Sequence, residues 1–163
     1  MSLIRRACGL HTSIARILNY LQSPLLLAIR LYWGWQLAQT GWGKLHNIDH
    51  VAEFFTSLSL PHPHFTAIFV ALVEFVGGIL LALGLGSRLV PFVIFINMTV
   101  AYWTADRENF GHILDDPGKF YAADPYTFWF AALVILIFGP GYLALDRLIG
   151  RFFGYENPPA KIA

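Results

Sequence analysis

Residues 65–85 read FTAIFVALVEFVGGILLALGL, an apolar run of 21 residues that contains a single charge, Glu74. A helix needs about 20 apolar residues to cross roughly 30 Å of hydrocarbon. A membrane β-strand would instead alternate apolar and polar residues over about ten positions, and this run does not alternate. The stretch therefore predicts a membrane-spanning helix.

Three further apolar segments predict three further spans, at residues 24–45, 89–105 and 126–145. The composition agrees, because 56% of the chain is hydrophobic and 13% is charged, whereas soluble domains average roughly 45–50% and about 25%. Pro140, in Gly139-Pro140-Gly141, is predicted to kink or end the fourth helix because proline lacks the backbone N–H that helices use. The predicted fold is an all-α integral membrane four-helix bundle.

The flanks divide the chain into an amphipathic lead at 1–23, which we expect on the membrane surface, a membrane domain at 24–150, and a cytoplasmic tail at 151–163. Lys and Arg in short flanks favour the cytoplasmic side. One side of the predicted bundle carries seven of them: Arg5, Arg6, Arg16, Arg88, Arg147, Arg151 and Lys161. The other side carries three: Lys44, Arg107 and Lys119. Both termini are therefore predicted to be cytoplasmic, and the protein to be a multi-pass protein of the inner membrane.

Charge and motifs argue against several function classes. The net charge of +1 and the absence of a basic stripe argue against nucleic-acid binding. Cys8 is the only cysteine, so one chain can form no internal disulfide or dithiol. No phosphate loop, dinucleotide fingerprint or nucleophile motif occurs. Any redox chemistry therefore requires a bound cofactor.

Arg30 and Glu74 are the two charges predicted to lie well inside the apolar layer. A charge at the bilayer centre costs at least about 2.5–3.5 kcal/mol on insertion scales, so such residues face a partner charge, water or the bundle interior. We expect the two to pair, and they are the candidate catalytic residues, polarising or protonating a bound group. The alternative is an ion pair that only fixes the helix register.

Polar residues on the first and third predicted spans are candidates for binding a cofactor. Gln36, Thr40 and Lys44 follow one another at four-residue intervals on one helix face. With Asn97 and Trp103 they could form a pocket for an aromatic head group such as a quinone, which needs flat apolar walls and a few hydrogen-bond donors. Interhelical hydrogen bonding is the alternative role of Asn97.

The predicted outer loops hold five of the six histidines: His46, His50, His62, His64 and His112. Their spacing gives no fixed ligand geometry, so no metal or haem site is predicted. The linker at 106–125 is long for a helix connection. We expect it either to fold back as a lid over an outward-facing cavity or to be a plain surface loop.

Three motifs resemble the DoxX family of small four-helix bacterial membrane proteins. The first span has Arg30-Leu31, Gly34 and Gly41 to Lys44-Leu45. The second has residues 72–78 (LVEFVGG), then Leu83-Gly84-Leu85 and Arg88. The third is Gly139-Pro140-Gly141 followed by Leu145-Asp146-Arg147.

The resemblance covers roughly residues 25–150. It implies a membrane subunit associated with sulfur-linked oxidation, such as that of thiosulfate, which passes electrons to quinone. It also implies partners: the lipid bilayer, and other subunits of a membrane complex or further copies of the chain. A scaffold or assembly subunit, and a pathway for protons or small molecules, are the alternative functions.

Overall fold

The computed structural model describes residues 2–152, with side chains from residue 18 onward. The predicted tail therefore lies mostly outside the described residues. Helices and turns make up this part of the chain, and no strand occurs in it. The helices are α1 (Ser2–Leu45), α2 (Ile48–Ser57), α3 (Pro63–Leu83), α4 (Leu89–Thr104), α5 (Arg107–Gly111), α6 (Pro117–Ala122), α7 (Pro125–Phe138) and α8 (Leu145–Phe152).

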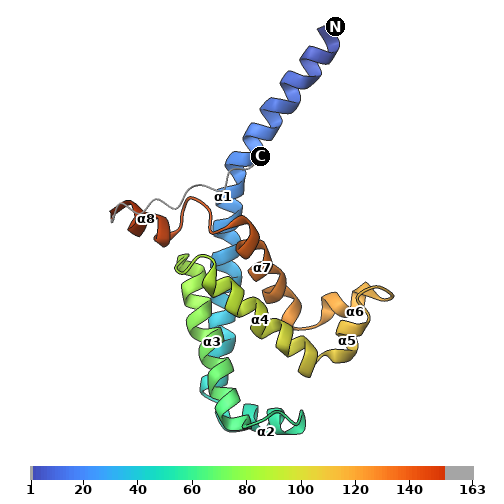
Figure 1. Cartoon of the computed structure of the whole chain (residues 1–163), viewed down its shortest axis with the longest axis vertical. Helices are drawn as coiled ribbons and strands as arrows, with labels where there is room; N and C mark the ends of the chain where they lie inside the picture. Colours follow the sequence, from blue (N-terminus) through green and yellow to red (C-terminus); the bar gives the residue numbers. More distant parts are fainter. Residues whose placement is uncertain (1, 153–163) are drawn as a thin grey trace.

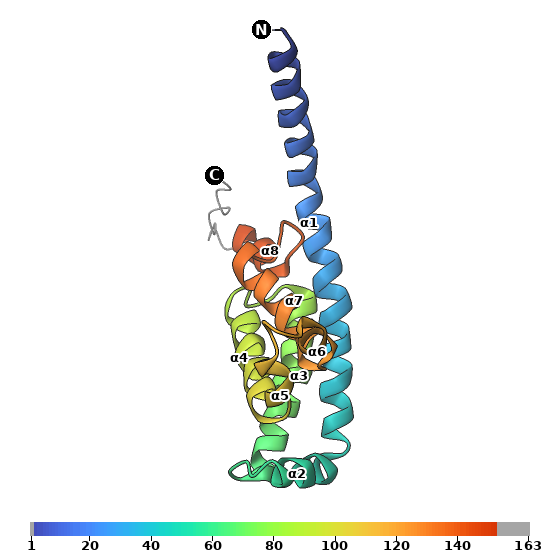
Figure 2. The same cartoon turned by 90° about the vertical axis from the view of Figure 1, so that its right-hand side faces the viewer.

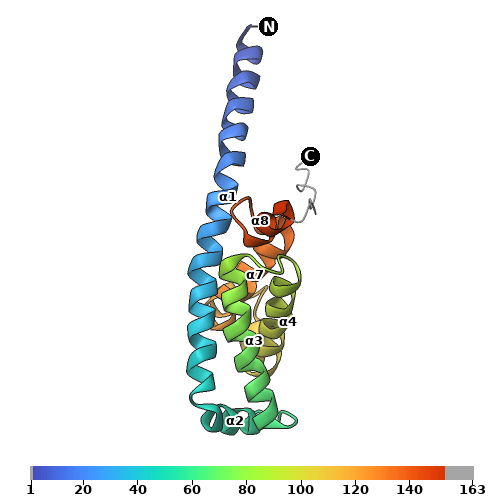
Figure 3. The same ribbon diagram turned by 90° about the vertical axis from the view of Figure 1, so that its left-hand side faces the viewer.

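The closest helix pair is α1 and α3, which run side by side and diverge toward the base (Figures 1 and 3). Glycines allow this approach. A Cβ on Gly78 would lie 2.5 Å from the Ala38 nitrogen and 2.6 Å from the Gly34 oxygen. Small residues at helix contacts let two backbones approach closely. Such packing drives the association of helices in a membrane, because lipid supplies no hydrophobic force between them.

The second layer is formed by α4 and α7, which pack on each other and lie obliquely against the first pair (Figures 1 and 2). One cluster of buried side chains joins the layers: Leu37, Leu81, Ile94, Met98, Ala132 and Ile135. At the end of the bundle where α1 stops, α2 lies across the base (Figure 3). The structure thus confirms the all-helical prediction.

The helices at the four predicted spans differ in length and apolarity. Among the described residues, only α3 is both long enough and apolar enough to cross a membrane. The apolar helices α4 and α7 have 16 and 14 residues. The predicted fourth span, 126–145, is wrong at its end, because α7 stops at Phe138. Gly139 there has a φ of +81°, and Pro140 lacks the N–H that would continue the helix.

The predicted lead, 1–23, is continuous with the first span in a single helix, α1. This N-terminal part extends beyond the rest of the molecule in all three views (Figures 1–3). Its location on a membrane surface stays a prediction.

The linker at 106–125 folds back onto the bundle through two short helices, α5 and α6. Phe120 is buried, and the Tyr102 hydroxyl donates a hydrogen bond of 2.8 Å to its carbonyl oxygen. At the exposed edge, a hydrogen bond with His112 lowers the pKa of Asp115 below its ordinary value. The linker thus packs on the bundle, as the first of the two alternatives expects, but this contact by itself does not make it a lid.

Asp146 fastens the turn between α3 and α4 to the start of α8. Its carboxylate accepts hydrogen bonds from the Gly86 nitrogen (3.1 Å), the Ser87 nitrogen (2.7 Å) and the Ser87 hydroxyl. Its own N–H donates to the Gly84 carbonyl at 3.2 Å. The Asp146 carboxylate therefore holds a turn that is distant from it in the sequence.

Asp146→Ala should lower the free energy of unfolding by about 1–2 kcal/mol, because it removes the acceptor of two backbone N–H groups. Denaturant titration in mixed micelles measures the change. Glu108→Ala, which truncates an exposed carboxylate on α5, is the matched control and should change stability little. Equal effects of the two variants would contradict this role of Asp146.

Candidate ligand-binding cavity

A buried ion pair joins α1 to α3. The Lys44 Nζ lies 2.5 Å from Glu74 Oε1, and the Thr40 hydroxyl lies 3.4 Å from Glu74 Oε2. The Glu74 side chain is only 5% exposed, whereas that of Lys44 is 34% exposed. The carboxylate is thus enclosed, while the lysine side chain is partly accessible.

This pair lies on the wall of a cavity of about 970 Å³. Residues from α1, α2, α3, α4 and α7 line it, together with short connections beside them. The apolar part of the lining includes Leu37, Phe54, Phe55, Met98 and Phe128. The polar part within the helices includes Gln36, Thr40, Lys44, Glu74 and Asn97. Apolar walls with a few converging polar groups are typical of sites for small organic ligands.

At the base of the bundle the cavity is covered by α2, a helix that was not predicted from the sequence (Figure 3). Val51, Phe54 and Leu58 of this segment line the cavity. Their spacing of three and four residues is that of one helix face and was the available signal. The expected lid, the linker at 106–125, contributes only its ends, Asp106 and the pair Asp124-Pro125. The covering element is therefore α2.

The model of the DoxX family matches residues 25–107, which is about half of the chain and extends from within α1 to the start of α5. The chain belongs to the DoxX family. Comparison with curated proteins and with solved structures gave no match. Every polar helix residue of the cavity named above lies within the matched range.

The predicted Arg30–Glu74 pair is wrong for this DoxX-family chain. Gly41 packs against residues 71–75, whereas Arg30 lies against Gly84. Arg30 and Gly41 are eleven residues apart on α1, or about 16 Å along the axis. Because that offset exceeds the reach of the two side chains, Glu74 pairs with Lys44 instead. Only one of the two candidate catalytic residues lines the cavity.

Arg30 is fully buried at the opposite end of the bundle. Its Nη2 donates to the Leu143 carbonyl at 2.6 Å, and its Nε and Nη1 have no hydrogen-bond partner within the described part of the chain. A second arginine acts nearby, since Arg88 Nη1 donates to the Leu136 carbonyl at 2.6 Å. Both arginines therefore bind carbonyls at or beyond the end of α7, where the helix leaves acceptors unpaired.

Of the five predicted cofactor-binding residues, four line the cavity and one does not. Gln36, Thr40, Lys44 and Asn97 come together around the cavity. Trp103 does not line it: its ring is exposed, with the Arg107 guanidinium 5.0 Å from the ring centroid.

Three of the predicted loop histidines each face a different partner. The Nδ1 of His46 lies 2.9 Å from the Trp42 carbonyl, whereas His50 faces Glu53 at 3.9 Å and His64 faces Asp49 at 3.7 Å. Within the described residues, no three His, Cys, Asp or Glu side chains are placed to hold a metal ion.

Proposed function

We propose that this DoxX-family protein is a multi-pass subunit of the bacterial inner membrane, with α1, α3, α4 and α7 crossing the bilayer and both termini in the cytoplasm. Exposed large apolar side chains along α3, α4 and α7 support this placement. The 16 residues of α4 and the 14 of α7 extend about 24 and 21 Å. Their flanking segments would complete the crossing near the headgroups, where water satisfies backbone groups.

We further propose that the cavity takes the head group of a quinone and that the protein serves a quinone-linked oxidoreductase. The Lys44–Glu74 pair on the wall of a cavity that also presents aromatic and aliphatic side chains is the observation that carries this proposal. A quinone ring is flat and apolar, and its two carbonyl oxygens accept hydrogen bonds. Ammonium and amide N–H groups donate them.

Each polar residue then has a distinct task. Lys44, whose side chain is partly exposed, would donate to a carbonyl oxygen of the ring, and the Asn97 amide is a second donor that lines the same cavity. Glu74 would hold or release a proton at its carboxylate, which Lys44 holds in place. A quinone supplies the capacity to carry electrons and protons. With a single cysteine in the chain, the oxidation of a reduced sulfur compound would fall to partner subunits.

Titration of the purified protein in lipid nanodiscs with a short-chain ubiquinone, followed by tryptophan fluorescence, tests the proposal. Lys44→Met should weaken binding by about tenfold or more, because a lost charge-assisted hydrogen bond is worth roughly 1.5–3 kcal/mol. Lys119→Met is the matched control: Lys119 also faces a carboxylate, Asp116 at 3.8 Å, but lies outside the cavity lining. It should bind like the wild type.

The double variant Lys44→Met/Glu74→Gln separates binding from packing. It removes both charges together, so no unpaired buried charge remains to unfold the helices. We expect a folded protein that no longer binds the quinone. A folded double variant with wild-type affinity would contradict the proposed site and favour a pair that only fixes helix packing.

A further inference from the structure

Helix α1 carries two opposite faces. One packs into the molecule through Ser23, Leu26, Arg30 and Leu37, all buried. Positions two residues away on a helix point in roughly the opposite direction. The residues on that opposite face are exposed over the same length: Leu18, Leu21, Leu25, Ala28, Tyr32, Trp35 and Gln39.

This exposed seam alternates steps of three and four residues, which is the spacing of the contact positions a and d in a two-stranded coiled coil. Its five largest apolar members are each more than half exposed. The exposed residues of α3 have similar spacing, from Phe65 to Leu83, but that face is apolar throughout. Lipid alone can cover the face of α3.

Two features distinguish the seam on α1. Gln39 lies between two contacts of α1 with α3. Ala38, just before it, packs against Gly78, and Gly41, two residues after it, packs against residues 71–75. Gln39 is therefore level with the middle of α3, yet its side chain is exposed. In the proposed membrane placement, a carboxamide there faces hydrocarbon, where an unsatisfied polar group is costly.

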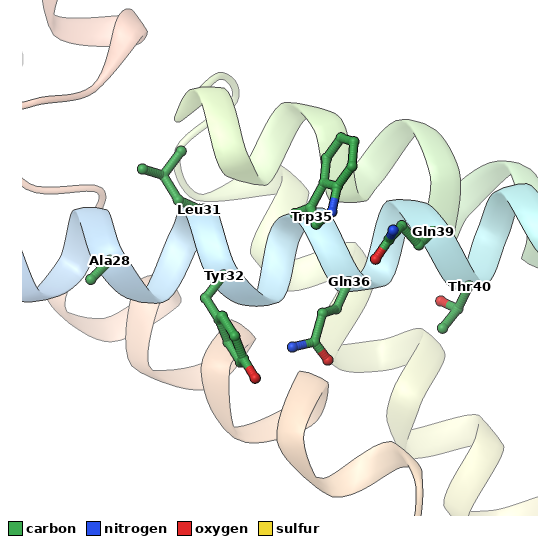
Figure 4. A pocket seen from close by; sticks show the side chains of 7 residues that line it. All are labelled: Ala28, Leu31, Tyr32, Trp35, Gln36, Gln39 and Thr40. Atoms are coloured by element: carbon green, nitrogen blue, oxygen red, sulfur yellow. The ribbon is translucent and has the colours of Figure 1, made fainter.

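The second feature is the shape of the surface. Two ridges of side chains, each with a four-residue repeat, enclose a groove of about 820 Å³ on α1 (Figure 4). One ridge is Ala28, Tyr32, Gln36 and Thr40, and the other is Leu31, Trp35 and Gln39. Grooves between such ridges receive the ridges of a second helix.

We propose that this seam binds the same seam of a second copy of the chain, so that the protein is a parallel α1–α1 dimer. A carboxamide carries both donors and an acceptor, so Gln39 of one copy can satisfy Gln39 of the other across a two-fold axis. A single polar residue at an a position is a known means of fixing register. The seam also includes Leu18 and Leu21, both more than half exposed, toward the N-terminal end of α1.

Cysteine cross-linking in native membranes tests the dimer. In a Cys8→Ala background, Trp35→Cys should give a disulfide-linked dimer on oxidation. Ile79→Cys is the control. Ile79 is exposed on α3, and the contact of Gly34 with residues 78–82 places it at the depth of the helical turn that contains Gln36. This variant should give little dimer. Adding Gln39→Leu to Trp35→Cys should reduce the yield about threefold, the value of one interhelical hydrogen bond in a membrane.

Absence of a dimer at Trp35→Cys, or equal yields at Trp35→Cys and Ile79→Cys, would overturn the proposal. Alkaline extraction of the same membranes shows separately whether each variant is inserted. A failed cross-link in an inserted protein thus counts against the dimer and not against the membrane placement. The test does not depend on quinone binding.

Discussion

Gly41→Ala is expected to lower the free energy of unfolding by about 1–3 kcal/mol, the usual cost of overpacking a close contact. A Cβ at this position would overlap the Phe75 nitrogen and lie 2.8 Å from the Ala71 carbonyl oxygen. These are backbone atoms of α3 and cannot rotate away, so α1 and α3 would have to separate. Titration with SDS in mixed micelles measures the stability change.

Gly43 supplies the control for this prediction within the same helix. No atom lies within 4 Å of a Cβ at Gly43, so Gly43→Ala should leave stability unchanged or raise it by up to about 1 kcal/mol through helix propensity. Both substitutions make the same chemical change within one turn. If they shifted stability in the same direction, the close packing of α1 against α3 would be contradicted.

Lys44→Met is expected to lower the free energy of unfolding by roughly 2–3 kcal/mol. Breaking a fully buried ion pair costs about 3–5 kcal/mol, and the loss is smaller here because Lys44 is partly exposed. The substitution leaves the enclosed Glu74 carboxylate without its cation. Glu74→Gln should cost less, about 1 kcal/mol, because the remaining ammonium can reach solvent. The two single variants should therefore differ in stability.

The double variant Lys44→Met/Glu74→Gln completes the cycle. It should lie within about 1 kcal/mol of the wild type, because neither charge remains unpaired. The same SDS titration provides all four free energies. Additive losses in the double variant would show that the two side chains act independently and would contradict the ion pair.

The sequence predicted the helical elements well where hydrophobicity alone determines them. The start of α4 at Leu89 agrees with the prediction, and that of α3 lies two residues before it. The end of α7 at Phe138 agrees with the break predicted at Gly139-Pro140-Gly141. The predicted span nevertheless ran on to residue 145, because hydrophobicity carries no information on backbone turns. Helix α2, which covers the cavity, was not predicted because its ten residues are too few for a membrane span.

Pairing between helices was harder to predict than the helices themselves. Arg30 and Glu74 were matched by estimated depth, but the depth at which α1 meets α3 depends on where glycines permit contact. Gly34 and Gly41 meet α3 at residues 78–82 and 71–75, and this register places Lys44 beside Glu74. Four polar residues predicted for the cavity nevertheless line it, because three of them share one helix face.

Mass spectrometry of the quinone that co-purifies with the protein from native membranes tests the central claim most directly. We expect about one quinone per chain in the wild type and in the Lys119→Met control. A folded Lys44→Met/Glu74→Gln variant should lose that quinone. A folded double variant that retains the quinone, or a wild-type protein that carries none, would contradict a quinone site at the Lys44–Glu74 pair.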